Sequence, residues 1–378
     1  MKIVVAPDSF KGSLSAEQIC DIVENAAHEV FPGCEVVKVP AADGGEGTVD
    51  SVLASSSGQL RTKTVSDALG RPIAASYALL DSGKAVIEMA AASGLPQIAE
   101  ADRDVMHSST RGTGELILDA LDHGCREIMI GLGGSATNDG GAGMAAALGV
   151  RFLNAAGEEL MPVPADFAAI ERVDISHLDP RVSDTHFVLM SDVRNPLLGE
   201  EGATRVYGPQ KGVTDAVFDE LESGMSHYID KVEYAVGFPV RSIPGAGAAG
   251  GLGAGLLAFT RAEVTSGIEK VLDLADFDSK LRGADLAVTG EGRMDSQSVY
   301  GKVTAGVGKR CEAAGVPCLA LVGSVGEGAE AMYDCGITSI VPTVDRIMTL
   351  REAIRNAESQ CYRAAVRMFR CAGALQAK

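Results

Sequence analysis

The chain has 378 residues, which exceeds the roughly 250 to 300 residues at which a single hydrophobic core stops growing, so we expect two domains. Hydrophobic residues make up 46% of the chain and charged residues 22%, a composition that excludes a disordered protein. The formal net charge of -18 argues against binding to nucleic acid or anionic lipid, because basic residues are not concentrated in any segment.

Signals for export, membrane insertion and zinc binding are also missing from the sequence. The apolar run at residues 3–6 is too short for a signal peptide, and no later run reaches the roughly 18 residues of a membrane helix. The eight cysteines form no CxxC pair, and the six histidines form no zinc motif. We therefore expect a cytoplasmic protein that is not bound to a membrane and whose cysteines are reduced core residues.

The first sixty residues alternate between strand and helix patterns. Residues 2–6 predict a buried strand, and Ser15 followed three residues later by Gln18 is a capping box that predicts the start of a helix. A second strand is predicted at residues 36–39 and a second helix at residues 48–55. This order of elements is typical of a parallel sheet.

A different pattern begins at about residue 61. The short β-rich runs at residues 61–65, 73–80 and 85–89 are separated by turn residues and predict an antiparallel meander. Further elements are expected in the order helix, strand, glycine-rich loop, helix and strand, at residues 114–121, 127–131, 131–143, 144–148 and 187–190. This part of the chain therefore reads as a mixed α/β domain.

The strand and helix alternation returns after a segment rich in alanine and glycine at residues 245–258. Strands are predicted at residues 284–289, 318–322 and 337–341, and a helix at residues 303–314. We therefore predict an α/β protein in which one parallel-sheet domain, residues 1–62 and 265–378, is interrupted by an inserted mixed α/β domain, residues 63–264.

Four loops that follow predicted strands contain carboxylates, at residues 7–13, 43–47, 191–195 and 289–295. Loops at the carboxyl ends of parallel strands line the ligand crevice of such sheets. Helix capping or a tight turn would explain any one of these loops, but four together indicate a shared site. Clustered carboxylates suit Mg²⁺ bound together with phosphate groups, and Lys11 is a phosphate-binding candidate unless it is only a solvated surface lysine.

The glycine-rich loop at residues 131–143 joins a predicted strand to a predicted helix. Its backbone N–H groups could bind a phosphate or a carboxylate, and the alternative is a tight turn that allows close helix packing. The GxGxxG pattern at residues 245–250 lacks the strand and the later acidic residue of a dinucleotide site. Residues 301–304 lack the glycine-spaced loop of a Walker motif.

Seven blocks of the sequence resemble one family over essentially the whole chain. They are, in order, KIVVAPDSFKGS (2–13), ADGGEGT (42–48), STRGTGE (109–115), GGSATNDGGAG (133–143), GPQKG (208–212), PGAGAAGG (244–251) and TGEGRMDSQS (289–298). These blocks closely resemble the bacterial glycerate kinases of the glucarate, galactarate and glyoxylate pathways. Met294 departs from the pattern, since a smaller branched apolar residue is expected there.

The resemblance implies ATP- and Mg²⁺-dependent phosphorylation of D-glycerate, usually at the 2-hydroxyl, which gives 2-phosphoglycerate. It also implies a flavodoxin-like domain interrupted by a second α/β domain. We expect the site to lie in a cleft between the domains that closes on binding and excludes water. The oligomeric state stays open, with a homodimer as one alternative.

Roles for individual residues are our own hypotheses. We favour Asp192 as the proton acceptor, with Asp8 and Asp295 as alternatives, and we expect Asp43 and Glu46 to hold Mg²⁺. Other predicted roles are binding of the γ-phosphate and of the substrate carboxylate. The candidates for these contacts are Lys11, Lys211, Arg71, Arg293, Ser9, Gly133, Gly134, Ser135, Thr137, Asn138 and Glu291. Two other functions stay open, a kinase for another small hydroxy acid and a non-catalytic regulator that binds a metabolite.

Overall fold

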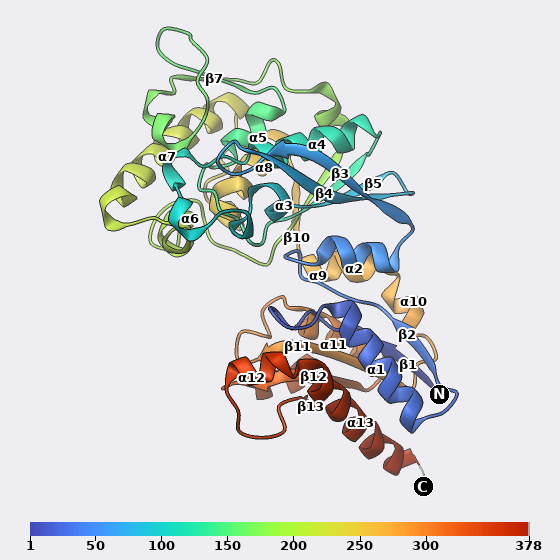
Figure 1. The fold of residues 1–378 in the computed structure, drawn as a ribbon. Helices are drawn as coiled ribbons and strands as arrows, with labels where there is room; N and C mark the ends of the chain where they lie inside the picture. The colour runs from blue at the N-terminus through green and yellow to red at the C-terminus, as the bar shows by residue number, and fades with distance from the viewer. Residues whose placement is uncertain (377–378) are drawn as a thin grey trace. The chain divides into compact units, whose positions relative to one another are not determined.

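The computed structural model describes residues 1–376, which form two compact units. The first unit contains Met1–Asp43, Asp50–Ser56 and the described residues from Ser266 onward, and the second contains Gly44–Val49 and Ser57–Thr265. The second unit is thus inserted in the sequence of the first (Figure 1). Each unit has its own sheet, so each is described separately.

The first unit is built on a five-stranded parallel sheet. Its strands are β1 (Lys2–Val5), β2 (Glu35–Lys38), β11 (Leu286–Met294), β12 (Cys318–Val325) and β13 (Ile337–Pro342). They lie side by side in the order β2-β1-β11-β12-β13, and every neighbouring pair is parallel. When the five strands are numbered along the chain, the order is 2-1-3-4-5, which is that of a flavodoxin-like sheet.

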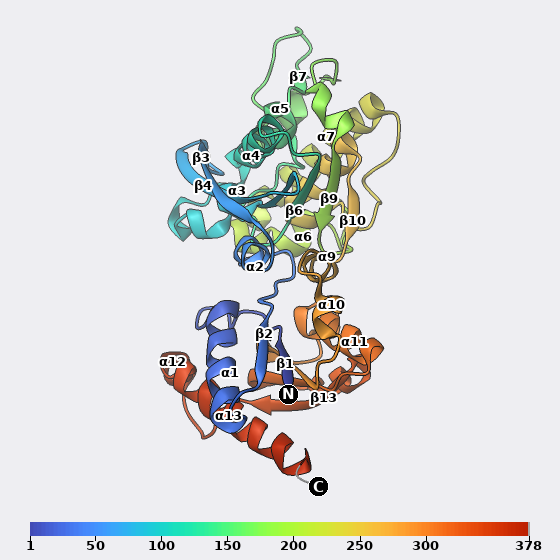
Figure 2. The same cartoon turned by 90° about the vertical axis from the view of Figure 1, so that its right-hand side faces the viewer.

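Helices cover both faces of this sheet. On one face, α1 (Ala16–Val30) and α13 (Ala357–Gln376) lie side by side and share an apolar core with β1 and β11 (Figures 1 and 2). The other face packs against α9 (Gly267–Leu274), α10 (Phe277–Leu281) and α11 (Val303–Ala314). Two shorter helices complete the unit, α12 (Leu350–Arg355) and most of α2 (Thr48–Ser55).

The predicted capping box at the start of α1 is confirmed. The side chain of Ser15 accepts a hydrogen bond from the Gln18 N–H, and the Gln18 side chain accepts one from the Ser15 N–H. These bonds satisfy two backbone donors that the first turn of a helix leaves without partners. A local sequence signal therefore fixes where this helix begins.

The second unit contains a six-stranded mixed sheet. Its strands are β3 (Gly58–Ser66), β4 (Pro72–Leu80), β5 (Lys84–Glu88), β6 (Glu127–Gly131), β9 (His186–Met190) and β10 (Glu263–Thr265). The predicted antiparallel meander is confirmed for β3, β4 and β5, and β5, β6, β9 and β10 then run parallel. A short antiparallel ribbon is formed by β7 (Arg151–Leu153) and β8 (Arg172–Asp174).

Six α-helices accompany this second sheet. They are α3 (Ala90–Ser93), α4 (Arg111–Asp122), α5 (Ala142–Ala147), α6 (Ala203–Tyr207), α7 (Asp215–Val236) and α8 (Leu252–Thr260). The sequence patterns predicted no helix at α3, α6, α7, α9, α10, α12 or α13, and the predicted start of α4 was three residues late. The alanine- and glycine-rich segment is helical only from Leu252, since Ala249 and Gly250 before it have positive φ.

The described residues contain no helix with the length and apolar character needed to cross a membrane. All eight cysteines are free. Seven of them are buried, but Cys371 is exposed on α13, so the expectation that every cysteine lies in the core was wrong there.

Candidate active site

The order of strands in the first sheet reverses direction beside β1. The chain moves from β1 to β2 on one side and later returns to β11 on the other side of β1. In open parallel sheets the loops at such a point diverge at the carboxyl edge and leave a crevice for a ligand. The loop after β1 carries Asp8, Ser9 and Lys11, which our sequence reading selected for this reason.

A cavity of about 600 Å³ lies at this edge of the first sheet. Its walls come from the loop after β1, the carboxyl ends of β11, β12 and β13, and residues of α12 and α13. The charged residues that line it are Asp8, Lys11, Asp43, Glu291, Arg293 and Lys302. The structure therefore brings most of the predicted first-unit residues into one cavity.

The surroundings of Asp8 shift the pKa of its carboxyl group strongly. Its residue is 6% exposed, and its Oδ1 accepts a hydrogen bond of 2.7 Å from the Ser9 N–H. Burial and, next, the negative charge of Asp43 raise the pKa of Asp8 to about 7, while Lys11 lowers it in part. A carboxylate in this position gains from any cation that enters the cavity.

Glu291 is held in place by two partners. Its Oε1 accepts a hydrogen bond of 2.7 Å from Oγ1 of Thr304, and its Oε2 lies 3.2 Å from Nζ of Lys302. Our sequence reading placed Glu291 and Arg293 in a loop after the strand, and this was wrong. Strand β11 continues to Met294 because it pairs with β12 as far as Val325, the last residue of that strand.

Lys302 is a cavity residue that our sequence reading missed. It precedes the first residue of α11 and lies eleven positions after its carboxylate partner Glu291. Residues 301–304 do not form a Walker motif, and nothing else in the local sequence distinguishes this lysine from a solvated one. A cation at the start of a helix that follows an acidic strand end is the signal that could have found it.

Arg293 and Asp295 form a pair at the end of β11. The guanidinium Nε of Arg293 lies 3.1 Å from Oδ2 of Asp295, and the arginine side chain is 67% exposed. Asp295 also accepts a hydrogen bond from the Gln297 N–H through Oδ1. Among the described residues Arg293 lines the cavity and Asp295 does not. Asp295 instead stabilises the turn that follows the strand.

The donor set of the cavity suits Mg²⁺ only together with a phosphate ligand. No group of three or more His, Cys, Asp or Glu residues in the described part of the chain could hold a metal ion by itself. Mg²⁺ is usually bound by one or two carboxylates together with water and substrate phosphates, and it does not need such a cage. Asp8 and Asp43 supply two carboxylates whose charges interact, so they fit this requirement.

A second set of predicted loops meets at the carboxyl edge of the sheet in the second unit. A Cβ added to Gly131 would lie 2.2 Å from the carbonyl oxygen of Gly44, and one added to Gly133 would lie 2.8 Å from Cα of Gly45. A Cβ on Gly44 would lie 2.9 Å from the carbonyl oxygen of Met190. The end of β6, the loop that follows it and the end of β9 therefore pack backbone to backbone against residues 44–45.

Three exposed predicted groups lie on these packed loops. Glu46 follows the Gly44–Gly45 pair, Asp192 comes two residues after the end of β9, and Gly133 and Gly134 follow β6. Within the described residues, the N–H groups of Gly133 and Gly134 donate to no protein acceptor. These two N–H groups are therefore available to an anionic ligand.

The rest of the glycine-rich loop is occupied by a buried carboxylate. Asp139 accepts hydrogen bonds from the N–H groups of Gly141 and Gly143 and from the N–H and hydroxyl of Thr110. Burial raises the pKa of Asp139, and these four donors oppose that effect. One alternative for this loop was that its backbone N–H groups bind an anionic ligand, but Asp139 already accepts from the N–H groups of Gly141 and Gly143.

Lys211 lies beneath this loop and not on its surface. The 3-10 helix Pro209–Lys211 buries it to 1% exposure, and its Nζ donates hydrogen bonds to Oγ of Ser135 and the carbonyl oxygen of Thr137. Burial lowers the pKa of Lys211 to about 7. Asn138 donates to Oγ1 of Thr204, so this predicted binding residue also supports the loop from inside.

Arg71 lies in the turn between β3 and β4. Its Nε donates a hydrogen bond of 2.6 Å to Oδ2 of Asp67, and Oδ1 of the same aspartate accepts from the N–H groups of Leu69 and Arg71. The guanidinium is half exposed. The structure thus gives Arg71 a role in shaping this turn and does not bring it into the first-unit cavity.

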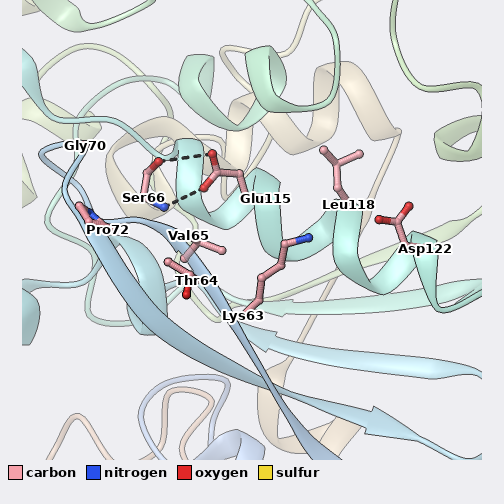
Figure 3. Close-up of a pocket in the computed structure, with 9 residues that line it drawn as sticks. All are labelled: Lys63, Thr64, Val65, Ser66, Gly70, Pro72, Glu115, Leu118 and Asp122. Atoms are coloured by element: carbon pink, nitrogen blue, oxygen red, sulfur yellow. Dashed lines mark hydrogen bonds between the residues drawn. The ribbon is translucent and has the colours of Figure 1, made fainter.

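A shallow hollow on the second unit lies between β3 and α4 (Figure 3). Glu115 accepts hydrogen bonds from the N–H and hydroxyl of Ser66, as the dashed lines in Figure 3 show. Lys63 pairs with Asp119, and Asp122 pairs with Arg181. Because each charged lining group already has a protein partner, this hollow offers no group for a ligand.

Comparison with known proteins places the chain in a family. The model of the glycerate kinase family matches residues 3–373. The chain belongs to the glycerate kinase family. It is 46% identical to the glycerate kinase of Halalkalibacterium halodurans and 44% identical to the glycerate 2-kinase of Escherichia coli, over 96% of each chain in both cases.

A solved structure supports the same assignment. The crystal structure of glycerate kinase 2 from Salmonella typhimurium matches with a TM-score of 0.90 and 40% identity, and the match covers 100% of both chains. The flavodoxin-like unit interrupted by a mixed α/β unit is therefore shared with this structure. As a member of the glycerate kinase family, the chain is an enzyme that transfers a phosphoryl group.

Proposed function

We propose that this protein transfers the γ-phosphoryl group of ATP to the 2-hydroxyl of D-glycerate, with Mg²⁺, and releases 2-phosphoglycerate and ADP. The names of the glycerate kinase relatives support the acceptor, and the name of the Escherichia coli relative supports the 2-position. The observation that carries the proposal is the first-unit cavity, in which carboxylates and cations lie together at the strand ends. Phosphoryl transfer needs this combination of charges.

Asp8 and Asp43 are the residues that would hold Mg²⁺ in the first unit, and Glu46 is the further candidate in the second. Bound Mg²⁺ would neutralise charge on the phosphate oxygens. The chain itself supplies Lys11 and Lys302 as cations that can contact phosphate groups. Glu291 orients Lys302 through the contact at 3.2 Å, so the lysine reaches the cavity in a defined position.

Asp192 is the proposed acceptor of the proton of the substrate hydroxyl. It is an exposed carboxylate at the carboxyl end of β9, where the catalytic groups of parallel sheets commonly lie. Such an acceptor need not be strong, because phosphoryl transfer depends mainly on alignment and charge neutralisation. Asp8 and Asp295 are the alternatives that the same measurement would test.

The N–H groups of Gly133 and Gly134 are the proposed partners of the glycerate carboxylate. They lie on an exposed loop that Asp139 and Lys211 hold from inside. Arg293 and Arg71 are further candidates. Arg293 pairs with Asp295, and Arg71 pairs with Asp67 and Asp102. A bidentate arginine contact would add specificity for a planar carboxylate.

Release of ADP in the presence of D-glycerate and Mg²⁺ tests the proposal. We expect release well above the background without glycerate, and phosphorus NMR of the product should show a phosphate on the 2-hydroxyl. A parallel panel of other small hydroxy acids separates glycerate from related substrates. Release that does not depend on any hydroxy acid would contradict the proposal.

A further inference from the structure

The first-unit cavity has an apolar wall that the chemistry described above does not use. This wall comes from the segment after β13 and from α12, and its residues are Val344, Met348, Leu350, Ala353 and Ile354. Leu350 is 76% exposed and Ile354 is 42% exposed. Large apolar side chains grouped at the mouth of a cavity mark a binding surface, whereas single exposed ones need no explanation.

A buried amide lies in the same cavity. Gln360 lines it from α13 and is 1% exposed. In the described part of the chain its Oε1 has no hydrogen-bond partner, and its Nε2 contacts only the sulfur of Met348, at 3.0 Å. A thioether is a weak acceptor, so both ends of this amide lack a good partner. Buried polar groups in this condition are rare and costly, and they point to a ligand.

The chemistry of an amide selects the kind of ligand. One amide side chain presents a donor and an acceptor side by side, and this pair is complementary to the adjacent acceptor and donor on the edge of adenine. The complementarity holds for either assignment of the amide oxygen and nitrogen. The flat apolar faces of the same base suit the wall formed by Met348, Leu350 and Ile354.

The strand order separates the polar part of the cavity from the apolar part. Asp8 and Lys11 follow β1, and Glu291 and Arg293 lie on the neighbouring β11. Val344 follows β13, which lies three strand positions from β1. At about 4.8 Å for each position, β13 lies about 14 Å from β1 and about 10 Å from β11. Such a cavity can take an elongated ligand with an anionic end and an apolar end.

We propose that this cavity is the adenine nucleotide site. The base lies against the wall of Met348, Leu350 and Ile354, its polar edge meets Gln360, and its phosphates extend toward Lys11 and Lys302. This inference rests on the proposed function for its choice of ATP, and it adds which unit holds the nucleotide and which residues recognise the base. Ser13, whose Oγ also lacks a partner among the described residues, lies in the same cavity as a polar group for the ribose.

Binding of ADP measured by calorimetry, with no glycerate present, tests the inference through Ile354→Asp. The charge would lie against the base, so we expect ADP to bind at least about tenfold more weakly, which is about 1.4 kcal/mol. The KM for ATP should rise with it while the KM for glycerate changes little. Ile347→Asp is the matched control, because Ile347 is 104% exposed and is not among the lining residues. This control should bind ADP like the parent.

Gln360→Glu tests recognition of the base separately. An ionised carboxylate has no donor and cannot satisfy both positions of the adenine edge, so the preference for ATP over GTP should fall at least about tenfold. Far-ultraviolet circular dichroism and the unfolding midpoint report whether this buried variant folds. If it does not fold, Leu350→Asp at the exposed wall gives the same test of the site, and unchanged ADP affinity there would overturn the inference.

The outcomes separate this inference from the proposed function. If the parent binds ADP and Ile354→Asp weakens that binding, the nucleotide site stands even if glycerate is not phosphorylated. If glycerate is phosphorylated but Ile354→Asp and Leu350→Asp bind ADP like the parent, the inference fails and the proposed function stands. If the parent neither binds ADP nor phosphorylates glycerate, both are wrong.

Discussion

Nζ of Lys211 donates a hydrogen bond of 2.7 Å to Oγ of Ser135, beneath the glycine-rich loop of the second unit. A second bond of 2.8 Å from the same nitrogen reaches the carbonyl oxygen of Thr137. A neutral amine still has two N–H groups, which is enough to donate both bonds, so the loop keeps this support when Lys211 loses its proton. The lysine therefore acts on the loop as a buried donor in either protonation state.

The first prediction concerns the pH dependence of stability. Burial lowers the pKa of Lys211 in the folded protein from 10.5 to about 7. Between these values the unfolded chain holds one more proton than the folded protein, so the free energy of unfolding from this group rises with pH. Urea denaturation at about pH 7 and about pH 9 should show this rise in the parent, and Lys211→Met should lack it.

Lys309→Met is the control for this measurement, because Lys309 is exposed on α11. It should keep the pH dependence of the parent. If the free energy of unfolding changes equally between about pH 7 and about pH 9 in the parent and in Lys211→Met, Lys211 is not held neutral by its surroundings.

The second prediction concerns the contact between the loops of the second unit. An alanine at Gly131 would place its Cβ 2.2 Å from the carbonyl oxygen of Gly44, and both partners are backbone. We expect Gly131→Ala to lower the free energy of unfolding by about 1–3 kcal/mol, as overpacking does. Urea denaturation gives this value, and glycerate turnover should fall with it because Gly133 and Gly134 must shift.

Gly224→Ala in α7 is the matched control. A Cβ there would lie 3.4 Å from Cβ of Phe167, which is an ordinary contact. Alanine also has a higher helix propensity than glycine. This variant should be as stable as the parent or slightly more stable. If Gly131→Ala is as stable as the parent, the conclusion that these loops pack closely is wrong.

Local signals predicted most of the elements of the first sheet. The apolar run of β1 and the capping box at Ser15 each act within a few residues, so they can be read without knowing the fold. The end of β11 could not be predicted in this way, since glycine and charged residues have low strand propensity. Pairing of Arg293 with Ser324 on β12 extends the strand, and a sequence pattern does not show the length of a partner strand.

The candidate site was predicted where it follows from strand order and missed where it depends on packing. Asp8 and Glu291 could be grouped because the carboxyl ends of parallel strands meet at one edge. A lysine in a polar segment suggests a solvated side chain, but tertiary packing buries Lys211. Gln360 is buried by the same kind of packing, so its polar side chain does not predict a buried position. The cleft between the domains and the homodimer stay predictions.

The third prediction tests the proposed proton acceptor. Asp192→Asn removes the acceptor without a change in size, so kcat with D-glycerate should fall by about 10²–10⁴. The KM for ATP and the unfolding midpoint should change little, because Asp192 is exposed. Asp184→Asn at the opposite end of β9 is the control and should keep the parent rate. If Asp192→Asn has a rate near that of the parent, Asp192 is not the proton acceptor, and Asp8 or Asp295 becomes the candidate.

The fourth prediction uses Asp8→Asn, which should have opposite effects on activity and on stability. The folded protein holds the Asp8 proton between pH 3.8 and about 7, so the free energy of unfolding from this group falls as pH rises through that range. Without Mg²⁺ at about pH 8, the asparagine variant should therefore be more stable than the parent. The full shift of about three pKa units sets an upper limit of about 4 kcal/mol on the gain.

Activity should change in the other direction. Asp8→Asn leaves Asp43 as the one proposed carboxylate ligand in the first-unit cavity, so half-maximal activity should require at least about tenfold more Mg²⁺. Asp334→Asn, an exposed change in the same unit, is the control and should alter neither quantity. Asp8→Asn could be more stable than the parent and still need the same Mg²⁺ concentration. This result would confirm that the Asp8 charge is buried, and it would show that the metal binds elsewhere, because only the Mg²⁺ requirement depends on Asp8 as a ligand.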